Sequence, residues 1–212
     1  MIQSSNKSVE EIISTLRDNL VWHGNSSFML KIDSKVIYFD PFFVPDDALK
    51  ADYVVISHSH FDHCSAYDLQ KIMKKDTKII GNKNVRTELQ GKLSLEGYIS
   101  MANSELKKVN GIEIECVDAY NQKEPEHPRG FGNGYLLKVG DISIYHAGDT
   151  DKIKEMDKLE YKADIAFLPV AGEVVMSTDY ARDAVKSIKP KVAVPMHYGS
   201  RFRFSDGDRY NS

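Results

Sequence analysis

The stretch that decides the fold is Tyr53-Val54-Val55-Ile56-Ser57-His58-Ser59-His60-Phe61-Asp62-His63. Its first four residues form a continuously apolar and mainly β-branched run, which predicts a strand buried on both faces. Three histidines and an aspartate follow within six residues. They lie at the carboxyl end of the predicted strand, where open α/β sheets build their sites. Ser65 then serves as the N-cap of a helix.

The three imidazoles and the carboxylate of residues 58–63 are side chains of the kind that bind a metal ion. Neutral imidazoles and carboxylates suit zinc, manganese or iron(II). Crowding them into one tight turn is costly without a cation, because the packed polar groups lose contact with water. The alternative is a surface loop that is rich in histidine by chance. Cys64, which follows directly, is either a metal-bound thiolate or a small buried thiol.

The string His58-Ser59-His60-Phe61-Asp62-His63 resembles the HxHxDH signature of the metallo-β-lactamase-fold superfamily. Further stretches resemble the other motifs of this superfamily in the same order, namely Phe39-Asp40-Pro41, His127, Gly148-Asp149-Thr150 and Pro195-Met196-His197-Tyr198-Gly199. Residues 22–28 and 168–170 are similar to the UlaG-like branch of the superfamily. The resemblance extends from about residue 20 to residue 199, which is nearly the whole chain.

The resemblance implies an α/β fold of the four-layer αββα sandwich type and a centre of two divalent metal ions. Zinc is the first choice of metal, and manganese or iron also suit the ligands. The first ion would be bound by His58, His60 and His127. The second would be bound by Asp62, His63 and His197, with Asp149 bridging the two ions. Asp40 would accept a hydrogen bond from a ligand imidazole and fix its tautomer.

Turn pairs elsewhere in the chain predict three hairpins, at Asp33-Ser34, Asn110-Gly111 and Gly140-Asp141. Apolar residues at helical spacing predict a helix over residues 9–20, with Val9, Ile12, Ile13, Leu16 and Leu20 on its apolar face. Residues 130–134, which contain three glycines, are predicted to form a flexible loop rather than a phosphate cradle, because the required strand and helix do not flank them. Since no linker or repeat interrupts residues 1–212, we expect a single domain.

Composition narrows the class of protein. The 212 residues are 42% hydrophobic and 28% charged, as is usual for a globular domain. The net charge of −3 gives no basic excess, so no nucleic-acid partner is expected. No apolar run approaches the roughly 18 residues that span a bilayer, and the polar start does not resemble a signal peptide. We therefore expect a cytoplasmic protein with reduced cysteines and no membrane association, acting on a small molecule. Homo-oligomer formation stays open.

The predicted function is that of a metal-dependent hydrolase. Two ions that share a hydroxide lower the pKa of its parent water and clamp an incoming oxyanion, so no serine or cysteine nucleophile is required. Such a bridging hydroxide would cleave a small cytosolic ester, lactone or phosphodiester. Asp62 is the expected catalytic group, because it lies beside the ligands and can orient the hydroxide or pass a proton.

Two alternatives to a hydrolase stay open. One is a metal-binding protein that has lost catalysis. The other is a metal-dependent redox protein, since flavodiiron oxygen reductases share the fold. This second alternative is less favoured, because those proteins resemble HxExDH and this chain has His60 at the glutamate position.

Three residues are candidates for binding the substrate. Asn25 stands where UlaG-like relatives carry a histidine. Arg129 and Arg201 lie close in sequence to predicted ligands, and their guanidinium groups suit a phosphate or carboxylate; solvated surface arginines are the alternative of equal weight. His23 is expected to be a hydrogen-bonded strand residue, and His146 a packing residue rather than a ligand.

Overall fold

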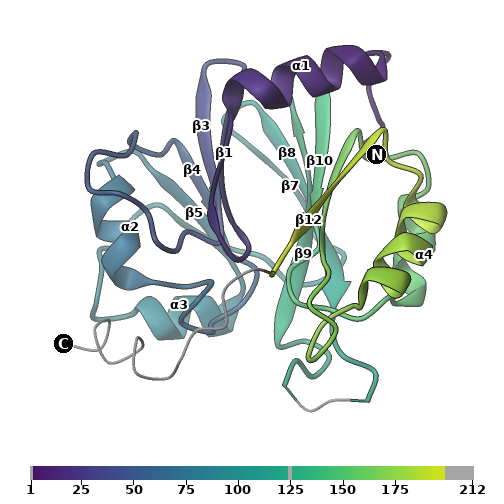
Figure 1. Ribbon diagram of the computed structural model, residues 1–212. Helices are drawn as coiled ribbons and strands as arrows, with labels where there is room; N and C mark the ends of the chain where they lie inside the picture. The colour runs from purple at the N-terminus through teal and green to yellow at the C-terminus, as the bar shows by residue number, and fades with distance from the viewer. Residues whose placement is uncertain (1, 124–125, 199–212) are drawn as a thin grey trace.

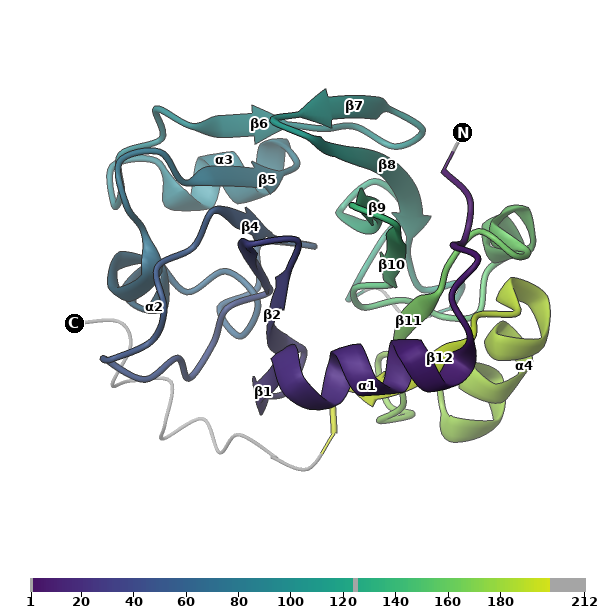
Figure 2. The same cartoon turned by 90° about the horizontal axis from the view of Figure 1, so that it is seen from above.

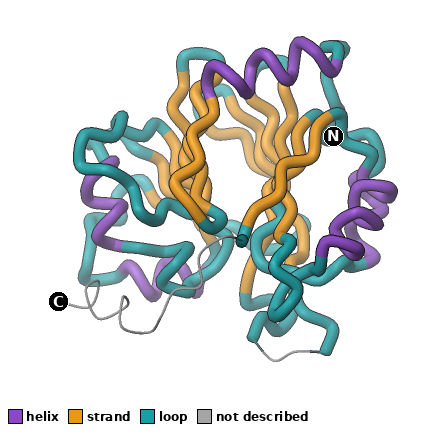
Figure 3. The backbone as a smooth tube through the Cα atoms, in the orientation of Figure 1, coloured by secondary structure: helices purple, strands orange, loops and turns teal. Residues whose placement is uncertain are grey.

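A computed structural model describes residues 2–123 and 126–198 of the chain. Two six-stranded β-sheets face each other, and helices lie on their outer sides (Figures 1 and 3). The layers therefore run helix, sheet, sheet, helix. The predicted four-layer αββα sandwich is confirmed.

The first sheet follows the chain in order, from β1 at one edge to β6 at the other. Its strands are β1 (Leu20–Gly24), β2 (Ser27–Ile32), β3 (Lys35–Phe39), β4 (Tyr53–Val55), β5 (Lys78–Gly81) and β6 (Tyr98–Ser100). The first three strands are antiparallel, whereas β3 to β6 run parallel. The segments after β3 and β4 consequently leave the sheet at the same end.

The second sheet has the order β12-β11-β10-β9-β8-β7. Its strands are β7 (Leu106–Val109), β8 (Ile112–Ala119), β9 (Gly132–Val139), β10 (Ile142–His146), β11 (Ile165–Pro169) and β12 (Val192–Met196). Strands β7 to β10 are antiparallel, and β10, β11 and β12 run parallel. The carboxyl ends of these last three strands therefore also share one end of their sheet.

The helices lie outside the two sheets, as the view from above shows (Figure 2). On the side of the first sheet are α2 (Ala66–Ile72) and α3 (Lys83–Leu89), and on the side of the second are α4 (Thr178–Ile188) and the 3-10 helix η1 (Lys154–Leu159). Helix α1 (Val9–Asn19) packs on β1, β2 and β12, at the edge where the two sheets come together. Among the described residues, no helix is long and apolar enough to cross a membrane.

Strands of the first sheet divide their side chains between two apolar cores. In β3, Ile37 and Phe39 join the core between the sheets, and Tyr38 joins the core beneath α2 and α3. In β4, Val55 and Val54 divide in the same way. All five are at most 1% exposed. The sequence predicted that the strand beginning at Tyr53, which is β4, is buried on both faces. This prediction is confirmed, because helices cover the side of β4 that does not face the second sheet.

All three predicted hairpins are confirmed, as β2–β3, β7–β8 and β9–β10. Asp33 and Ser34 have φ angles of 50° and 60°, and Asn110 and Gly111 have φ angles of 45° and 89°. Two successive residues with positive φ give a turn whose twist matches that of the flanking strands.

Two sequence expectations are corrected by the structure. The helix predicted over residues 9–20 ends at Asn19, because Leu20 begins β1, and Val9 and Ile13 of its predicted apolar face are each 42% exposed. Only one side of α1 packs on the sheets, and that side contains the buried Ile12.

The second correction concerns the loop predicted over residues 130–134. Its last three residues, from Gly132 onward, begin β9. A Cβ atom on Gly134 would lie 3.1 Å from the carbonyl oxygen of Ala147. The glycine thus lets the backbone of β9 approach the residue that follows β10 closely, which is a role that glycine often has within strands.

Candidate metal centre

The predicted ligands lie in four loops at one end of the two sheets. These loops follow β4, β8, β10 and β12. The parallel directions of β3 with β4, and of β10 with β11 and β12, bring the carboxyl ends of these strands to the same place, where α/β folds commonly build their sites. The site therefore follows from the strand order, and the seven side chains meet although they are far apart in sequence.

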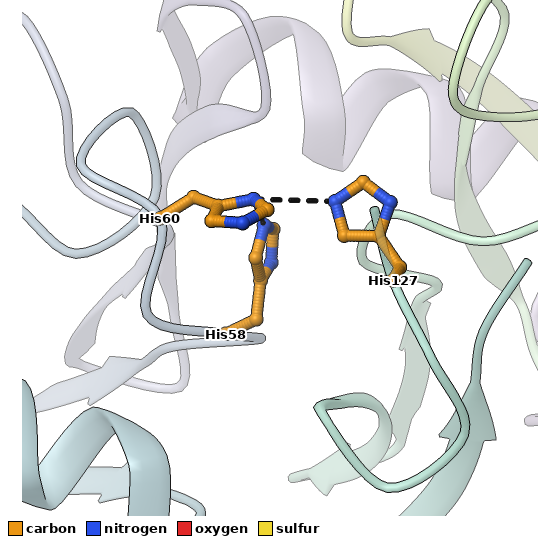
Figure 4. Close-up of side chains that lie close together, drawn as sticks. All are labelled: His58, His60 and His127. Atoms are coloured by element: carbon orange, nitrogen blue, oxygen red, sulfur yellow. Dashed lines mark hydrogen bonds between the residues drawn. The ribbon is translucent and has the colours of Figure 1, made fainter. Parts of the chain in front are cut away.

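His58, His60 and His127 form the three-histidine cluster (Figure 4). The Nδ1 atom of His60 lies 3.0 Å from Nε2 of His58 and 3.3 Å from Nε2 of His127. The first two rings come from the loop after β4, and the third comes from the β8–β9 loop on the other sheet. The cluster thus joins the two sheets across the sandwich.

Hydrogen bonds on the far side of the His58 and His127 rings define the tautomers of these two imidazoles. Ser57 Oγ donates to Asp40 Oδ2 at 2.6 Å and therefore accepts from Nδ1 of His58, 2.9 Å away. Asn121 Oδ1 accepts from Nδ1 of His127 at 2.8 Å, since the amide nitrogen of Asn121 already donates to a backbone carbonyl. The rings of His58 and His127 therefore carry their protons on Nδ1 and direct their Nε2 lone pairs towards Nδ1 of His60.

Asp62, His63 and His197 form the mixed cluster. Nε2 of His63 lies 3.5 Å from Oδ2 of Asp62, and its Nδ1 donates to Oδ2 of Asp40 at 2.8 Å. His197 follows β12 directly and has a positive φ of 57°. Asp40 thus accepts a hydrogen bond from the imidazole of His63.

Asp149 lies between the two clusters. Its Oδ2 is 3.0 Å from Nε2 of His197 and 3.4 Å from Nε2 of His63. The same oxygen is 3.5 Å from Nε2 of His127 and 4.0 Å from Nε2 of His58. One carboxylate oxygen thus faces two imidazoles from each cluster.

Gly148 is needed to bring Asp149 to this position. Its φ is +64°, and a Cβ atom there would lie 2.8 Å from Cβ of Ser57. Only glycine combines that backbone conformation with so close an approach. The Gly148-Asp149 dipeptide therefore allows the loop after β10 to lie directly against the loop after β4.

The buried charges shift the proton affinities of the centre in opposite directions. Burial lowers the pKa of His58, His60 and His127, so all three are neutral at physiological pH. Burial acts the same way on His63, but the carboxylates around it, led by Asp149, raise its pKa well above the usual value. For Asp149, burial would raise the pKa, but His63 and His197 hold it well below the usual range.

The side chains present fit divalent metal ions. Nε2 of His63 and Oδ1 of Asp149 are buried and have no hydrogen-bond partner among the described residues. The Nε2 lone pairs of His58 and His127 both face Nδ1 of His60 at about hydrogen-bond distance, an arrangement that needs a proton on His60 or a cation between the rings. Imidazole nitrogens and carboxylate oxygens are the ligands that zinc binds in proteins.

The three candidate substrate contacts have different surroundings. Asn25 is buried and donates through Nδ2 to Oδ2 of Asp62 at 2.9 Å. Arg129 forms ion pairs of 2.9 Å with Asp118 and 2.7 Å with Glu155. Arg201 lies outside the described residues. Substrate binding by these residues stays a prediction.

Two further histidines and Cys64 pack around the centre. The ring of His146 stacks on Phe39, with 5.3 Å between the ring centroids, and its Nε2 lies 3.3 Å from the carbonyl oxygen of Ser26. His23 stacks on a tyrosine of β3, but its Nε2 makes no hydrogen bond among the described residues, unlike the expectation of a hydrogen-bonded histidine. Cys64 is 4% exposed, and burial raises the pKa of its thiol far above the usual range.

Two residues that orient the rings were not found from the sequence. Ser57 directly precedes the histidine string, and only its position after a strand could have indicated a role. Asn121 lies six residues before His127, a spacing that belongs to no recognised pattern. Both contacts depend on how loops fold back, which local sequence does not reveal.

Comparison with known proteins agrees with the fold. The family model described as "Beta-lactamase superfamily domain" matches residues 19–197. A UPF0173 metal-dependent hydrolase of Thermoplasma acidophilum is 31% identical, and the match covers 85% of this chain and 83% of that relative. This chain therefore belongs to the beta-lactamase superfamily and, within it, to the UPF0173 family. The predicted superfamily is confirmed.

Solved structures show the same similarity. A candidate metal-dependent hydrolase of Parabacteroides distasonis superposes with a TM-score of 0.78 and 33% identity, covering 91% of this chain and 87% of that one. A metallo hydrolase of the hyperthermophilic archaeon Ignicoccus hospitalis gives a TM-score of 0.70 and 26% identity, covering 85% of this chain and 82% of that one. Both similarities extend over nearly the whole sandwich.

Proposed function

We propose that this protein is a hydrolase that acts with two divalent metal ions, one in the three-histidine cluster and one in the mixed cluster. The observation that carries this proposal is the position of Oδ2 of Asp149, which lies 3.0 to 4.0 Å from imidazole nitrogens of both clusters. A carboxylate in such a position suits a bridge between two ions. The names of the similar proteins from Thermoplasma and Ignicoccus, both hydrolases, support hydrolysis as the reaction.

Zinc is the metal that we propose first, because its usual ligands in proteins are imidazoles and carboxylates. Manganese and iron also bind such sets, and their availability influences which ion is present. When bound, two such ions lower the pKa of a shared water and stabilise negative charge that develops on the substrate oxygen.

Asp62 is the group we propose for handling the proton. Its side chain is 19% exposed, whereas His63 beside it is fully buried, so the carboxylate lies on the solvent side of the mixed cluster. Burial would raise the pKa of Asp62, but His63 outweighs that effect and lowers it. The carboxylate is therefore ionised near neutral pH and is able to accept a proton from an attacking water.

The substrate that we propose is a small ester, lactone or phosphodiester. Hydrolysis at carbonyl carbon and at phosphorus both place negative charge on an oxygen, which the same pair of ions would stabilise. A cytoplasmic location and a small-molecule partner without nucleic acid remain part of this proposal.

The test combines metal analysis with turnover. Purified protein is assayed by mass spectrometry for metals per chain, and then with a chromogenic phosphodiester and a panel of lactones, with and without added zinc or manganese. We expect close to two ions per chain and activity on one of the two substrate classes. Protein that binds no metal on titration would overturn the proposal, and two bound ions without any turnover would favour a metal-binding protein that has lost catalysis.

The variant Asp62→Asn tests the role of the carboxylate. We expect turnover to fall by about 10²- to 10⁴-fold, the usual contribution of general acid–base catalysis. Metal content is measured in the same sample, because loss of an ion would also lower the rate. An Asp62→Asn protein with both ions and the wild-type rate would exclude Asp62 as the catalytic group.

A further inference from the structure

One residue of the β1–β2 turn contacts two of the three members of the mixed cluster. Asn25 is 4% exposed, and its Nδ2 donates to Oδ2 of Asp62 at 2.9 Å. Its backbone carbonyl accepts from the backbone N–H of His197 at 3.0 Å. Asp62 and His197 come from different sheets, so this single turn residue connects the two loops that supply them.

The turn itself holds Asn25 in a defined conformation. Asn25 has a φ of 47° and follows Gly24, which has a φ of 119°. Asparagine adopts this left-handed conformation at lower cost than most residues. The indole nitrogen of Trp22 donates to the same carbonyl at 3.1 Å, and the indole stacks on Tyr198 with 5.0 Å between centroids. The carbonyl that contacts His197 is therefore held from β1 and from the end of β12.

The side-chain amide of Asn25 restrains a carboxylate that is partly exposed to solvent. Asp62 is 19% exposed on its side chain, and its Oδ2 lies 3.5 Å from Nε2 of His63. The amide of Asn25 donates to that same oxygen, so rotation of the carboxylate towards water breaks the hydrogen bond. Because an amide carries no charge, it fixes the carboxylate without neutralising it.

The two clusters thus have different supports. Asn121 holds the ring of His127 in the three-histidine cluster, at 2.8 Å. Asn25 holds Asp62 and His197 in the mixed cluster. Two asparagines from different loops occupy corresponding roles, one at each cluster.

We propose that Asn25 is the positioning residue of the mixed cluster. It fixes the Asp62 carboxylate and the backbone of His197, and so determines how tightly the mixed cluster binds its ion while leaving the three-histidine cluster unaffected. This inference rests on the proposed two-metal function.

Four variants test the inference. Asn25→Gly keeps the left-handed turn and its backbone carbonyl but deletes the amide, and Asn25→Asp keeps the shape but sets a carboxylate against Asp62. Asn121→Ala removes the corresponding support from the other cluster. Asn110→Gly is the matched control, because Asn110 also has a left-handed φ, of 45°, in the β7–β8 turn.

Each metal-free protein is titrated with zinc against a chromophoric chelator, which gives the two binding affinities of the chain. We expect Asn25→Gly to weaken one affinity by about 10- to 100-fold, as is typical for partners of metal ligands. Asn25→Asp should weaken the same affinity at least as much, and Asn121→Ala should weaken the other. Asn110→Gly should change neither. Thermal unfolding of the metal-free proteins reports on the fold, and Asn25→Asp decides the case if the glycine variant does not fold.

The outcomes separate the inference from the function on which it rests. Wild-type protein that binds fewer than two zinc ions overturns the proposed function. Wild-type protein that binds two, together with Asn25 variants that keep both affinities, overturns the inference alone. Asn25 variants that lose both affinities equally and unfold at lower temperature without metal would also overturn it, since Asn25 would then serve only the turn.

Discussion

The three-histidine cluster and the mixed cluster lie side by side but are built differently. The first has three neutral rings, and its outer hydrogen bonds go to a hydroxyl and an amide, those of Ser57 and Asn121. The mixed cluster includes a carboxylate, and its buried ring at His63 donates to the carboxylate of Asp40. A cation in the mixed cluster therefore meets more negative charge than one in the three-histidine cluster. One centre thus contains two sites with different electrostatics.

The largest expected effect follows from removing the charge that the clusters share. Asp149→Asn keeps the shape of the side chain but deletes the carboxylate between them. We expect loss of at least one bound ion and a fall in turnover of about 10³-fold, since metal ions supply several kcal/mol of transition-state stabilisation. Metal content and hydrolysis rate are measured on the same preparation. Two retained ions and an unchanged rate would show that the clusters do not depend on Asp149.

The next largest effect is expected at Asp40, whose carboxylate supports both clusters. This carboxylate accepts directly from His63 in one cluster and, through Ser57, supports His58 in the other. Asp40→Asn should therefore weaken both zinc affinities by about 10- to 100-fold. Asparagine tolerates the left-handed φ of 42° at this position.

Ser57→Ala is the matched variant, because it removes the link between Asp40 and His58 but leaves the hydrogen bond from His63 to Asp40 in place. We expect it to weaken the affinity of the three-histidine cluster and to leave that of the mixed cluster unchanged. Competition titrations of the two variants and the wild type measure both affinities. Equal losses at both clusters in Ser57→Ala would contradict the view that Ser57 supports the three-histidine cluster alone.

The sequence predicted the strand that leads into the centre and the turns of the hairpins. The buried run before His58 defined a strand, and the resemblance of the motifs to the superfamily implied which side chains would lie together. Hairpins such as Asn110-Gly111 were also predictable, because few residue pairs adopt two positive φ angles. These signals are local, and each requires a particular residue type at a particular position.

Long-range contacts were the part that the sequence did not reveal. Nothing in the sequence indicated that the amide of Asn25 donates to Asp62, because the two residues are 37 positions apart. The segment that forms β5, α3 and β6 was not assigned, because its short elements have weak patterns and depend on the neighbouring parallel strand β4. The first residues of β9 were expected to be a loop, because glycines carry no side-chain pattern.

The smallest expected effect compares Asp149 with a buried carboxylate outside the centre. Asp164 accepts from the backbone N–H of Ser5 at 2.9 Å and of Ser143 at 2.8 Å, and it pairs with Lys191 at 2.9 Å. Burial would raise the pKa of Asp164, but Lys191 and these N–H groups lower it overall. Asp164 therefore has its partners within the protein, whereas one oxygen of Asp149 has none among the described residues.

Because the folded pKa of Asp164 lies below its unfolded value, its contribution to stability is complete above the unfolded pKa of about 3.9 and is lost as the pH falls through the folded pKa. Asp164→Asn should lower the free energy of unfolding by about 2 kcal/mol at neutral pH, as expected for hydrogen bonds to a charged group. Urea unfolding at several pH values measures the difference, which should shrink below about pH 4. A metal chelator should leave the effect of Asp164→Asn unchanged but alter that of Asp149→Asn. If the chelator changed both effects equally, the two carboxylates would not differ in the way that their partners indicate.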